Sequence, residues 1–281
     1  MLAPNPGSVV PTDKVAGDAN LRKPVTRRRR IYRILEKLAA PAFALGLILL
    51  WELFARYSGI SEFVLPAPSA IVARMGVDHR LLLSNAYVTA IEVLGGFLIA
   101  TVAGIGLALA IFYLRIVEIA IYPILIALQT IPKVALAPLI VIYFGYGWGP
   151  KLFLSFIISF FVIVVSTVVG LQGMDSGYAR VVRSMGATER QIFLKVRLPA
   201  ALPSIFGSLK VALTLAVIGA VLGEYVAAEK GLGYLQLQAN ANFDMILNYA
   251  AVVSIGLLGV LFYGLIRVAE RIFVAKRASS R

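Results

Sequence analysis

Six long runs of apolar residues constrain this chain more than any other feature of its sequence. An α-helix needs about 20 consecutive, mostly apolar residues to cross the hydrocarbon core of a bilayer. With 60% hydrophobic and 15% charged residues among 281, the chain carries more apolar side chains than one water-soluble core can bury. We therefore predict an all-α polytopic membrane protein with six transmembrane helices. The predicted spans are residues 38–57, 85–113, 116–144, 151–171, 205–225 and 249–273.

The basic residues predict the orientation of these spans. Of the 27 Lys and Arg residues, 21 fall in residues 1–37, at Arg115, in residues 178–210 or in residues 267–281. With an even number of spans, these four segments lie on one side of the membrane. Basic loops stay in the cytoplasm, so we expect a multi-pass protein with both termini cytoplasmic. The net charge of +13 does not indicate a nucleic-acid partner, because the charge is clustered between apolar runs as in proteins of the lipid bilayer.

The chain begins with a segment of a different composition. Residues 1–30 are rich in Pro, Gly and Asp and end in Arg27–Arg30, which predicts a disordered basic cytoplasmic tail whose arginines bind anionic lipid. Residues 31–281 are predicted to form the transmembrane domain. A twin-arginine export signal is the alternative for the tail, but five further spans follow instead of a soluble domain.

The second and third runs carry patterns beyond hydrophobicity. In residues 85–113 a glycine or alanine recurs every four residues from Gly96 to Ala108, which predicts a face where another helix packs closely. Residues 116–144 contain three prolines, each of which removes a backbone donor. Broken backbone at membrane depth is tolerated only against protein or a water-filled cavity, so this run is expected to line a pathway. The predicted pathway residues are Gln129, Thr130, Pro132 and Lys133, with Ser166, Thr167 and Glu224 opposite.

Two of the acidic residues inside predicted spans are candidates for a buried role. Glu92 and Glu224 are costly in hydrocarbon, and such residues usually face a bundle interior or a cavity. A functional role and a structural pairing both stay open for each. The structural partner of Glu224 would be backbone or Lys230, and that of Glu92 a basic residue from another span.

The long basic loop after the fourth span is patterned like two short helices. Tyr178, Val181, Val182 and Met185 share one helical face, and Gly186 follows as a residue that ends helices. Thr188 with Gln191 fits a capping box that starts a second helix. Leu198-Pro199 and Pro203 are expected to end that helix before the fifth span. Two amphipathic helices joined at a glycine indicate docking onto a partner, with a helix lying on the membrane surface as the alternative.

This loop resembles the EAA loop of ABC importer permeases. The family pattern is Gly, nine residues and Ile-x-Leu-Pro, and here Gly186 is followed by nine residues and Val196-Arg197-Leu198-Pro199. The name-giving Glu-Ala-Ala is replaced by Arg180-Val181-Val182. Residues 40–275 are also similar to the nitrate/sulfonate/taurine branch of the family. The matching stretches include Leu65-Pro66-Ala67-Pro68-Ser69, Ile131-Pro132-Lys133, Arg183-Ser184-Met185-Gly186-Ala187-Thr188 and Gly231-Leu232-Gly233.

The resemblance implies a permease subunit in the bacterial plasma (inner) membrane. Its implied partners are a second copy of the chain, ABC ATPase subunits and an external solute-binding protein, and its solute is expected to be a small anion such as nitrate, a sulfonate or a carboxylate. The loop then couples the spans to the ATPase. The expected coupling residues are Tyr178, Arg180, Val182, Met185, Gly186, Ala187, Thr188, Leu198 and Pro199.

Nothing in the sequence predicts catalysis or a cofactor on this chain. No Gly-x-x-x-x-Gly-Lys-Ser/Thr motif occurs, so ATP and Mg are expected on the partner ATPase. Cysteine is absent and His79 is the lone histidine, which argues against a metal site. An ion-coupled secondary transporter is the main alternative, but it would need paired internal repeats. An intramembrane enzyme would need a nucleophile motif such as Gly-x-Ser-x-Gly, which is also missing.

Overall fold

The computed structural model describes residues 25–173 and 176–278, and within these ranges every regular element is helical. The chain divides into two units, residues 1–58 and 59–281. The first unit holds α1 (Val25–Tyr57), whose apolar stretch 38–57 has no buried residue, which suits a helix surrounded by lipid or by another protein. Residues 1–24 of the predicted tail lie outside the described residues, and residues 25–30 belong to α1.

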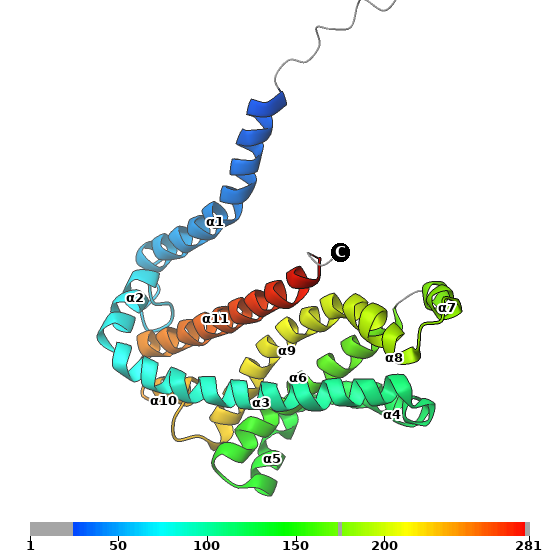
Figure 1. The fold of residues 1–281 in the computed structure, drawn as a ribbon. Helices are drawn as coiled ribbons and strands as arrows, with labels where there is room; N and C mark the ends of the chain where they lie inside the picture. Colours follow the sequence, from blue (N-terminus) through cyan, green and yellow to red (C-terminus); the bar gives the residue numbers. More distant parts are fainter. Residues whose placement is uncertain (1–24, 174–175, 279–281) are drawn as a thin grey trace, which may run out of the picture. The chain divides into compact units, whose positions relative to one another are not determined.

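Four predicted spans of the second unit are confirmed as long continuous helices. Helix α6 lies between α3 and α9 and makes the most extensive contacts of the fold with both (Figure 1). The core of this unit fills the space between these three helices, where Val93, Ile163 and Ala216 are completely buried. The four helices are α3 (His79–Tyr113), α6 (Trp148–Gln172), α9 (Leu198–Ala227) and α11 (Met245–Ala278).

The predicted stripe of small residues is confirmed as a packing face of α3 on α6. A Cβ atom at Gly96 would lie 2.4 Å from the Cβ of Ser155, and one at Gly104 would lie 2.9 Å from Ile163. A Cβ at Gly219 of α9 would lie 2.6 Å from the Cα of the same Ser155. The backbones of α3, α6 and α9 therefore approach as closely as small residues allow, which is how helices associate in lipid.

The third predicted span is broken, as its prolines predict. It consists of α4 (Arg115–Gln129), the 3₁₀ turn η1 (Lys133–Leu136) and α5 (Ala137–Phe144), with a bend of 89°. The chain breaks around Pro132, because a proline cannot donate its backbone nitrogen and restricts the residue before it.

The bent pair nevertheless runs from one end of α6 to the other. Near the start of α4, Glu118 accepts a hydrogen bond of 3.2 Å from Gln172 at the end of α6. At the end of α5, the ring of Phe144 stacks on Phe153 near the start of α6, with centroids 5.0 Å apart. The pair thus counts as one broken span, which gives six spans together with the five continuous apolar helices.

The loop after α6 contains the two expected short helices, but its end differs from the prediction. Helix α7 (Ser176–Ser184) is followed by α8 (Glu189–Ile192), the π-helical turn η2 (Phe193–Arg197) and α9. Pro199 does not end the helix, since residues 189–227 form one continuous helical stretch. Pro199 sits in the first turn of α9 after the π turn, where the missing donor costs little, and Pro203 is accommodated inside α9.

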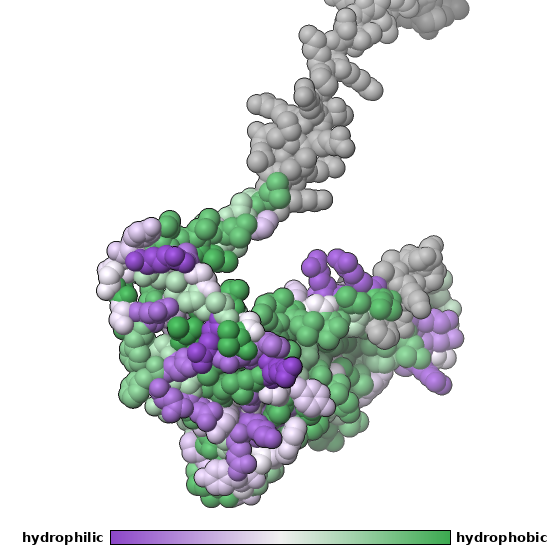
Figure 2. All heavy atoms as spheres, turned by 90° about the vertical axis from the view of Figure 1, so that its left-hand side faces the viewer, coloured by the Kyte–Doolittle hydropathy of each residue, from purple (hydrophilic) through white to green (hydrophobic). Residues whose placement is uncertain are grey.

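Two shorter helices lie at the end of the unit opposite to that loop. They are α2 (Pro68–Val77), before α3, and α10 (Leu232–Ala241), between α9 and α11. Arg74 of α2 forms an ion pair of 2.7 Å with Asp244, next to the start of α11. Figure 2 faces the side where α2 and the first turns of α3 and α11 lie, and hydrophilic side chains gather there among apolar ones.

Candidate functional site: the α7–α8 loop and a buried charge cluster

The turn between α7 and α8 has the geometry that its sequence predicts. Gly186 has a φ of +85°, a conformation that favours glycine. The capping box is confirmed: Gln191 N donates to Thr188 Oγ1 over 3.3 Å, and Thr188 N donates to Gln191 Oε1 over 2.9 Å. Arg183 Nε donates to Glu189 Oε1 over 2.7 Å, which ties α7 to α8. The turn is therefore specified by its own residues.

Helix α7 and Met185, which directly follows it, present apolar side chains to their surroundings. Met185 is 80% exposed and Val181 is 58% exposed, while Val182 is half-buried. Arg180 is exposed beside them, and the side chain of Tyr178 lies outside the described residues. An apolar face on a short basic helix is the type of surface that docks into a groove of another protein.

Helix α8 and the turn η2 are anchored to the transmembrane helices. Ile192 is completely buried, and the ring of Phe193 lies 5.4 Å from that of Tyr113 at the end of α3. The guanidinium of Arg197 lies over the ring of Phe112, 5.0 Å from its centroid. A force on the loop therefore reaches α3 through these contacts and α9 through the continuous helix. Of the remaining predicted coupling residues, Ala187, Leu198 and Pro199 are half-buried and Thr188 is exposed.

The predicted pathway residues fall in separate places. Gln129, Thr130 and Pro132 are exposed at the break after α4, and half-buried Lys133 lies over the ring of Phe161 at 5.2 Å. On α6, Ser166 is half-buried and Thr167 is completely buried, with a hydroxyl that has no hydrogen-bond partner among the described residues. Glu224 is 1% exposed, and among the described residues its hydrogen bonds go to Thr89 and Gly233 and not to the segment 129–133. Among the predicted pathway residues, those at the break in the third span are the ones that offer polar groups to an open surface.

Glu92, in the second span, pairs with a basic residue of another span. This agrees with the structural role, one of the two roles predicted for it. Lys151 Nζ at the start of α6 lies 2.6 Å from Glu92 Oε1 on α3, and both side chains are at most 6% exposed. The sequence prediction missed Lys151. In the sequence, Lys151 is a lysine at the very edge of an apolar run. A lysine at such a position usually extends its ammonium group into water.

Glu224 binds backbone, which is the structural alternative predicted for it, and not Lys230, which is exposed. Its Oε2 accepts a hydrogen bond of 2.5 Å from Gly233 N, and its Oε1 accepts one of 2.6 Å from Thr89 Oγ1. The Thr89 oxygen in turn accepts a bond of 2.8 Å from Leu232 N. A carboxylate at the N-terminus of a helix interacts favourably with its dipole. Side chains of α3 and α9 thus hold the first turn of α10.

These two sites form one buried cluster, defined here by Thr89, Glu92, Lys151 and Glu224. The carboxyl groups of Glu92 and Glu224 interact with each other and with the ammonium of Lys151. Glu92 Oε2 is buried and has no hydrogen-bond donor among the described residues. The cluster links α3, α6, α9 and α10 at the end of the unit opposite to the α7–α8 loop.

Gly231 is required by the cluster and is predicted to be intolerant of substitution. Its φ is +126°, and an added Cβ would lie 2.2 Å from the carboxyl carbon of Glu224. Gly147 has the same φ and open space around it. Positive φ costs a side chain about 1–3 kcal/mol at either position, and Gly231→Ala should lose about 1.5–3 kcal/mol more as the charged hydrogen bond breaks.

Thermal unfolding of the full chain in lipid nanodiscs measures this difference. We expect Gly231→Ala to unfold at a clearly lower temperature than Gly147→Ala. Equal unfolding temperatures for the two variants would show that the contact with Glu224 does not matter.

Known proteins with similar sequences are transport permeases. A family model described as "Binding-protein-dependent transport system inner membrane component" matches residues 100–278. The formylaminopyrimidine transport permease protein ThiX of Halalkalibacterium halodurans is 37% identical over 250 residues, covering 89% of this chain and 98% of ThiX. The riboflavin transport system permease protein RibX of Chloroflexus aurantiacus is 34% identical, covering 91% and 98%.

A solved structure shows the same fold. A chain of the MetNI methionine ABC transporter, in an inward-facing conformation, superposes with a TM-score of 0.57 at 22% identity. The match covers 73% of this chain and 98% of the other. The helices described above therefore follow a known arrangement for such transporters.

Proposed function

The chain belongs to the family of binding-protein-dependent transport system inner membrane components and is the membrane-spanning permease subunit of an ATP-driven importer, and we propose that it works as a homodimer with two ATPase subunits and an external solute-binding protein. The observation that carries this proposal is the α7–α8 loop. It exposes an apolar face and is built rigidly into α3 and α9. Such a loop is placed to receive motion from a partner.

In this proposal ATP and Mg are bound by the partner and not by this chain. Closure of the ATPase dimer pulls on α7 and α8, and α9 moves with them because it continues from α8 without a break. Rocking of rigid helices about the dimer interface then exposes the pathway alternately to each side. Tyr178, Val182 and Met185 are the proposed anchors in the groove of the ATPase, with Gly186 setting the turn.

The proposed orientation places the α7–α8 loop and both termini in the cytoplasm. Basic residues support it, because Arg115, Arg180, Arg183 and Arg190 all lie at the loop end of the second unit. Helices α2 and α10 and the buried cluster then lie toward the outer side, where an external binding protein would deliver the solute.

The solute is proposed to be a small organic molecule. The two relatives described above are named for formylaminopyrimidine and riboflavin, both of which contain planar nitrogen heterocycles. We therefore propose a heteroaromatic solute as the first candidate. The small anion that the sequence resemblance implies stays a prediction.

The break in the third span is the proposed lining of the pathway. Lys133 offers a half-buried ammonium there, so Lys133→Glu should lower uptake several-fold by reversing the charge, whereas Lys133→Arg should retain most of it. Uptake into proteoliposomes that contain the purified permease, its ATPase and its binding protein measures the effect. Full uptake by the glutamate variant would remove Lys133 from the mechanism.

Native mass spectrometry of the same complexes checks assembly, with two permease and two ATPase chains expected. A single permease per complex would contradict the homodimer.

A further inference from the structure

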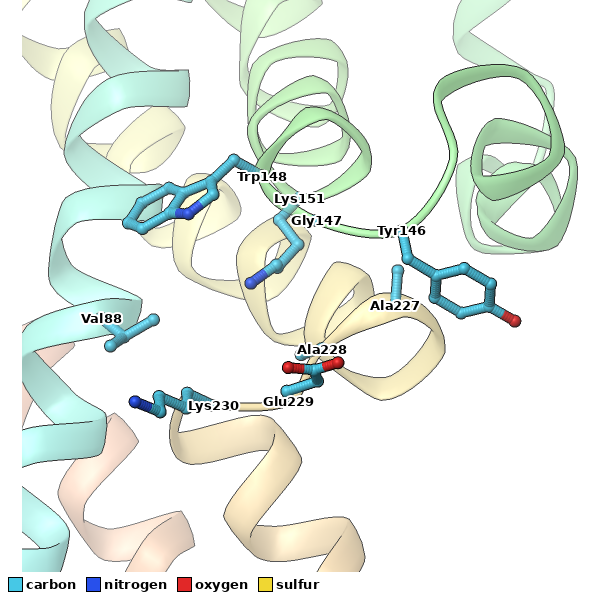
Figure 3. A pocket seen from close by; sticks show the side chains of 9 residues that line it. All are labelled: Val88, Tyr146, Gly147, Trp148, Lys151, Ala227, Ala228, Glu229 and Lys230. Carbon is cyan, nitrogen blue, oxygen red and sulfur yellow. The ribbon is translucent and has the colours of Figure 1, made fainter.

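A pocket of about 570 Å³ opens beside the buried cluster (Figure 3). Its walls come from α3, from the start of α6 and from the connection between α9 and α10, so three of the helices tied by the cluster meet around it. We call it the outer pocket. The lining residues are Val88, Tyr146, Gly147, Trp148, Lys151, Ala227, Ala228, Glu229 and Lys230.

The outer pocket has the size and position of a small-molecule site. Pockets that bind organic ligands typically have about 300–1,000 Å³. Glu229 and Lys230 are exposed at its rim, so its mouth faces water and not hydrocarbon. In the proposed orientation, this mouth is on the outer side of the membrane.

Lys151 supplies unused hydrogen-bond donors to this pocket. Its side chain is 6% exposed, and its Nζ has one hydrogen bond among the described residues, to Glu92 Oε1. An ammonium group has three N–H donors. Figure 3 shows the Nζ reaching into the space between Trp148 and Lys230. A buried donor that lacks partners is costly unless a ligand or water receives its hydrogen bonds.

The charges around the outer pocket do not favour an anion. Lys151 is neutralised by its ion pair with Glu92, and Lys230 at the rim is next to Glu229. What the pocket does offer is an aromatic wall, the indole of Trp148, and the Nζ of Lys151 lies over this ring at 5.5 Å from its centroid. Aromatic rings stack on one another with a preference beyond simple burial of area. The lining thus combines a stacking surface with a hydrogen-bond donor.

We propose that the outer pocket is a binding site of the permease for its own solute, and that it takes a planar heteroaromatic molecule. The ring of the solute packs on Trp148, and a carbonyl oxygen or ring nitrogen accepts a hydrogen bond from Lys151. This inference rests on the proposed function, because a solute released at the outer face would meet this pocket before the pathway. It adds a selection step on the permease itself.

Fluorescence of Trp148 tests the proposal directly. The chain has two tryptophans, Trp51 and Trp148, so Trp51→Phe leaves Trp148 as the single reporter. The full chain, in complex with its ATPase in nanodiscs, is titrated with formylaminopyrimidine or riboflavin as planar probes and with ethanesulfonate as an anionic probe. The matched Trp148→Phe protein retains Trp51 and corrects for absorption by the probe and for non-specific quenching.

A pocket-filling variant separates binding in the outer pocket from binding elsewhere. Val88→Phe places a ring in the pocket and leaves all four residues of the charge cluster unchanged, and it should weaken binding of the planar probe at least about tenfold, equivalent to about 1.4 kcal/mol. Val102→Phe is the control, because Val102 is 75% exposed on the same helix and does not line the pocket.

Saturable quenching of Trp148 by a planar probe, weakened by Val88→Phe and unchanged by Val102→Phe, is the expected result. Saturable quenching by ethanesulfonate alone, quenching by no probe, or equal affinity in the two variants would each overturn the inference. The ATPase content and ATP hydrolysis of the same samples report on the proposed function separately. A complete, active complex without probe binding contradicts only the outer pocket, whereas a chain that retains no ATPase contradicts the proposed function.

Discussion

Gly186→Val is expected to abolish coupled transport while the protein still inserts into the membrane with all its spans. Gly186 has a φ of +85°, and no atom would lie within 4 Å of an added Cβ, so the substitution acts through the backbone alone. A β-branched residue in this conformation costs about 1–3 kcal/mol or makes the turn adopt another geometry. Either change displaces α7 relative to α8 and misplaces the apolar face that the ATPase is proposed to bind.

The readouts are ATPase retention during purification and solute-stimulated ATP hydrolysis. Met185→Ala should lower both measurably but less severely, since it removes one exposed anchor and leaves the turn intact. Gly59→Val is the matched control, because Gly59 also has a positive φ, of +73°, and open space, but lies outside the loop. Wild-type retention and stimulation in Gly186→Val would show that the loop does not transmit the motion.

Lys151→Met is expected to be the most destabilising single substitution in the buried cluster. It removes the ammonium that interacts with both Glu92 and Glu224 and leaves their carboxyl groups without a cation. Breaking a buried ion pair by removing one partner typically costs about 3–5 kcal/mol. Glu92→Gln should cost much less, because Glu224 then balances Lys151 alone.

Thermal unfolding of the full chain in nanodiscs ranks these variants. The double variant Lys151→Met/Glu92→Gln should recover part of the stability that Lys151→Met loses, because only one carboxyl group is then left unbalanced. A Lys151→Met protein as stable as the wild type, or a Glu92→Gln protein that is less stable than the Lys151→Met protein, would contradict this account of the cluster.

Local and periodic features of the structure could be predicted from the sequence. Five continuous spans, the small-residue face around Gly96, the capping box of Thr188 and the turn at Gly186 depend on residues within a few positions of one another. Helical periodicity and turn chemistry are sufficient for such features. The coupling role of the loop came instead from the family resemblance.

Features that depend on distant residues could not be predicted. The bond between Lys151 and Glu92 joins positions 59 residues apart, and that between Thr89 and Glu224 joins positions 135 apart. Their partners depend on which faces of α3, α6 and α9 meet, and a hydropathy pattern does not determine this. The paired acids could be identified as residues needing partners, but the partners themselves, and the outer pocket beside them, required the structure.

The prolines show a second limit of sequence patterns. Pro132 coincides with a real break, whereas Pro199 and Pro203 lie within a continuous helical stretch. Pro199 directly follows the π turn η2, where a missing donor costs little. Pro203 and Pro123 lie inside α9 and α4 and are accommodated there. A proline therefore does not by itself decide where a helix ends.

We propose that this chain moves a solute only when a separate ATPase hydrolyses ATP. Uptake into proteoliposomes is measured with the permease, its ATPase and its binding protein, omitting in turn the ATPase, ATP and the binding protein, and with a proton or sodium gradient in place of ATP. The account predicts uptake only in the complete system with ATP, and none driven by either gradient. Gradient-driven uptake by the permease alone would contradict it and favour a secondary transporter.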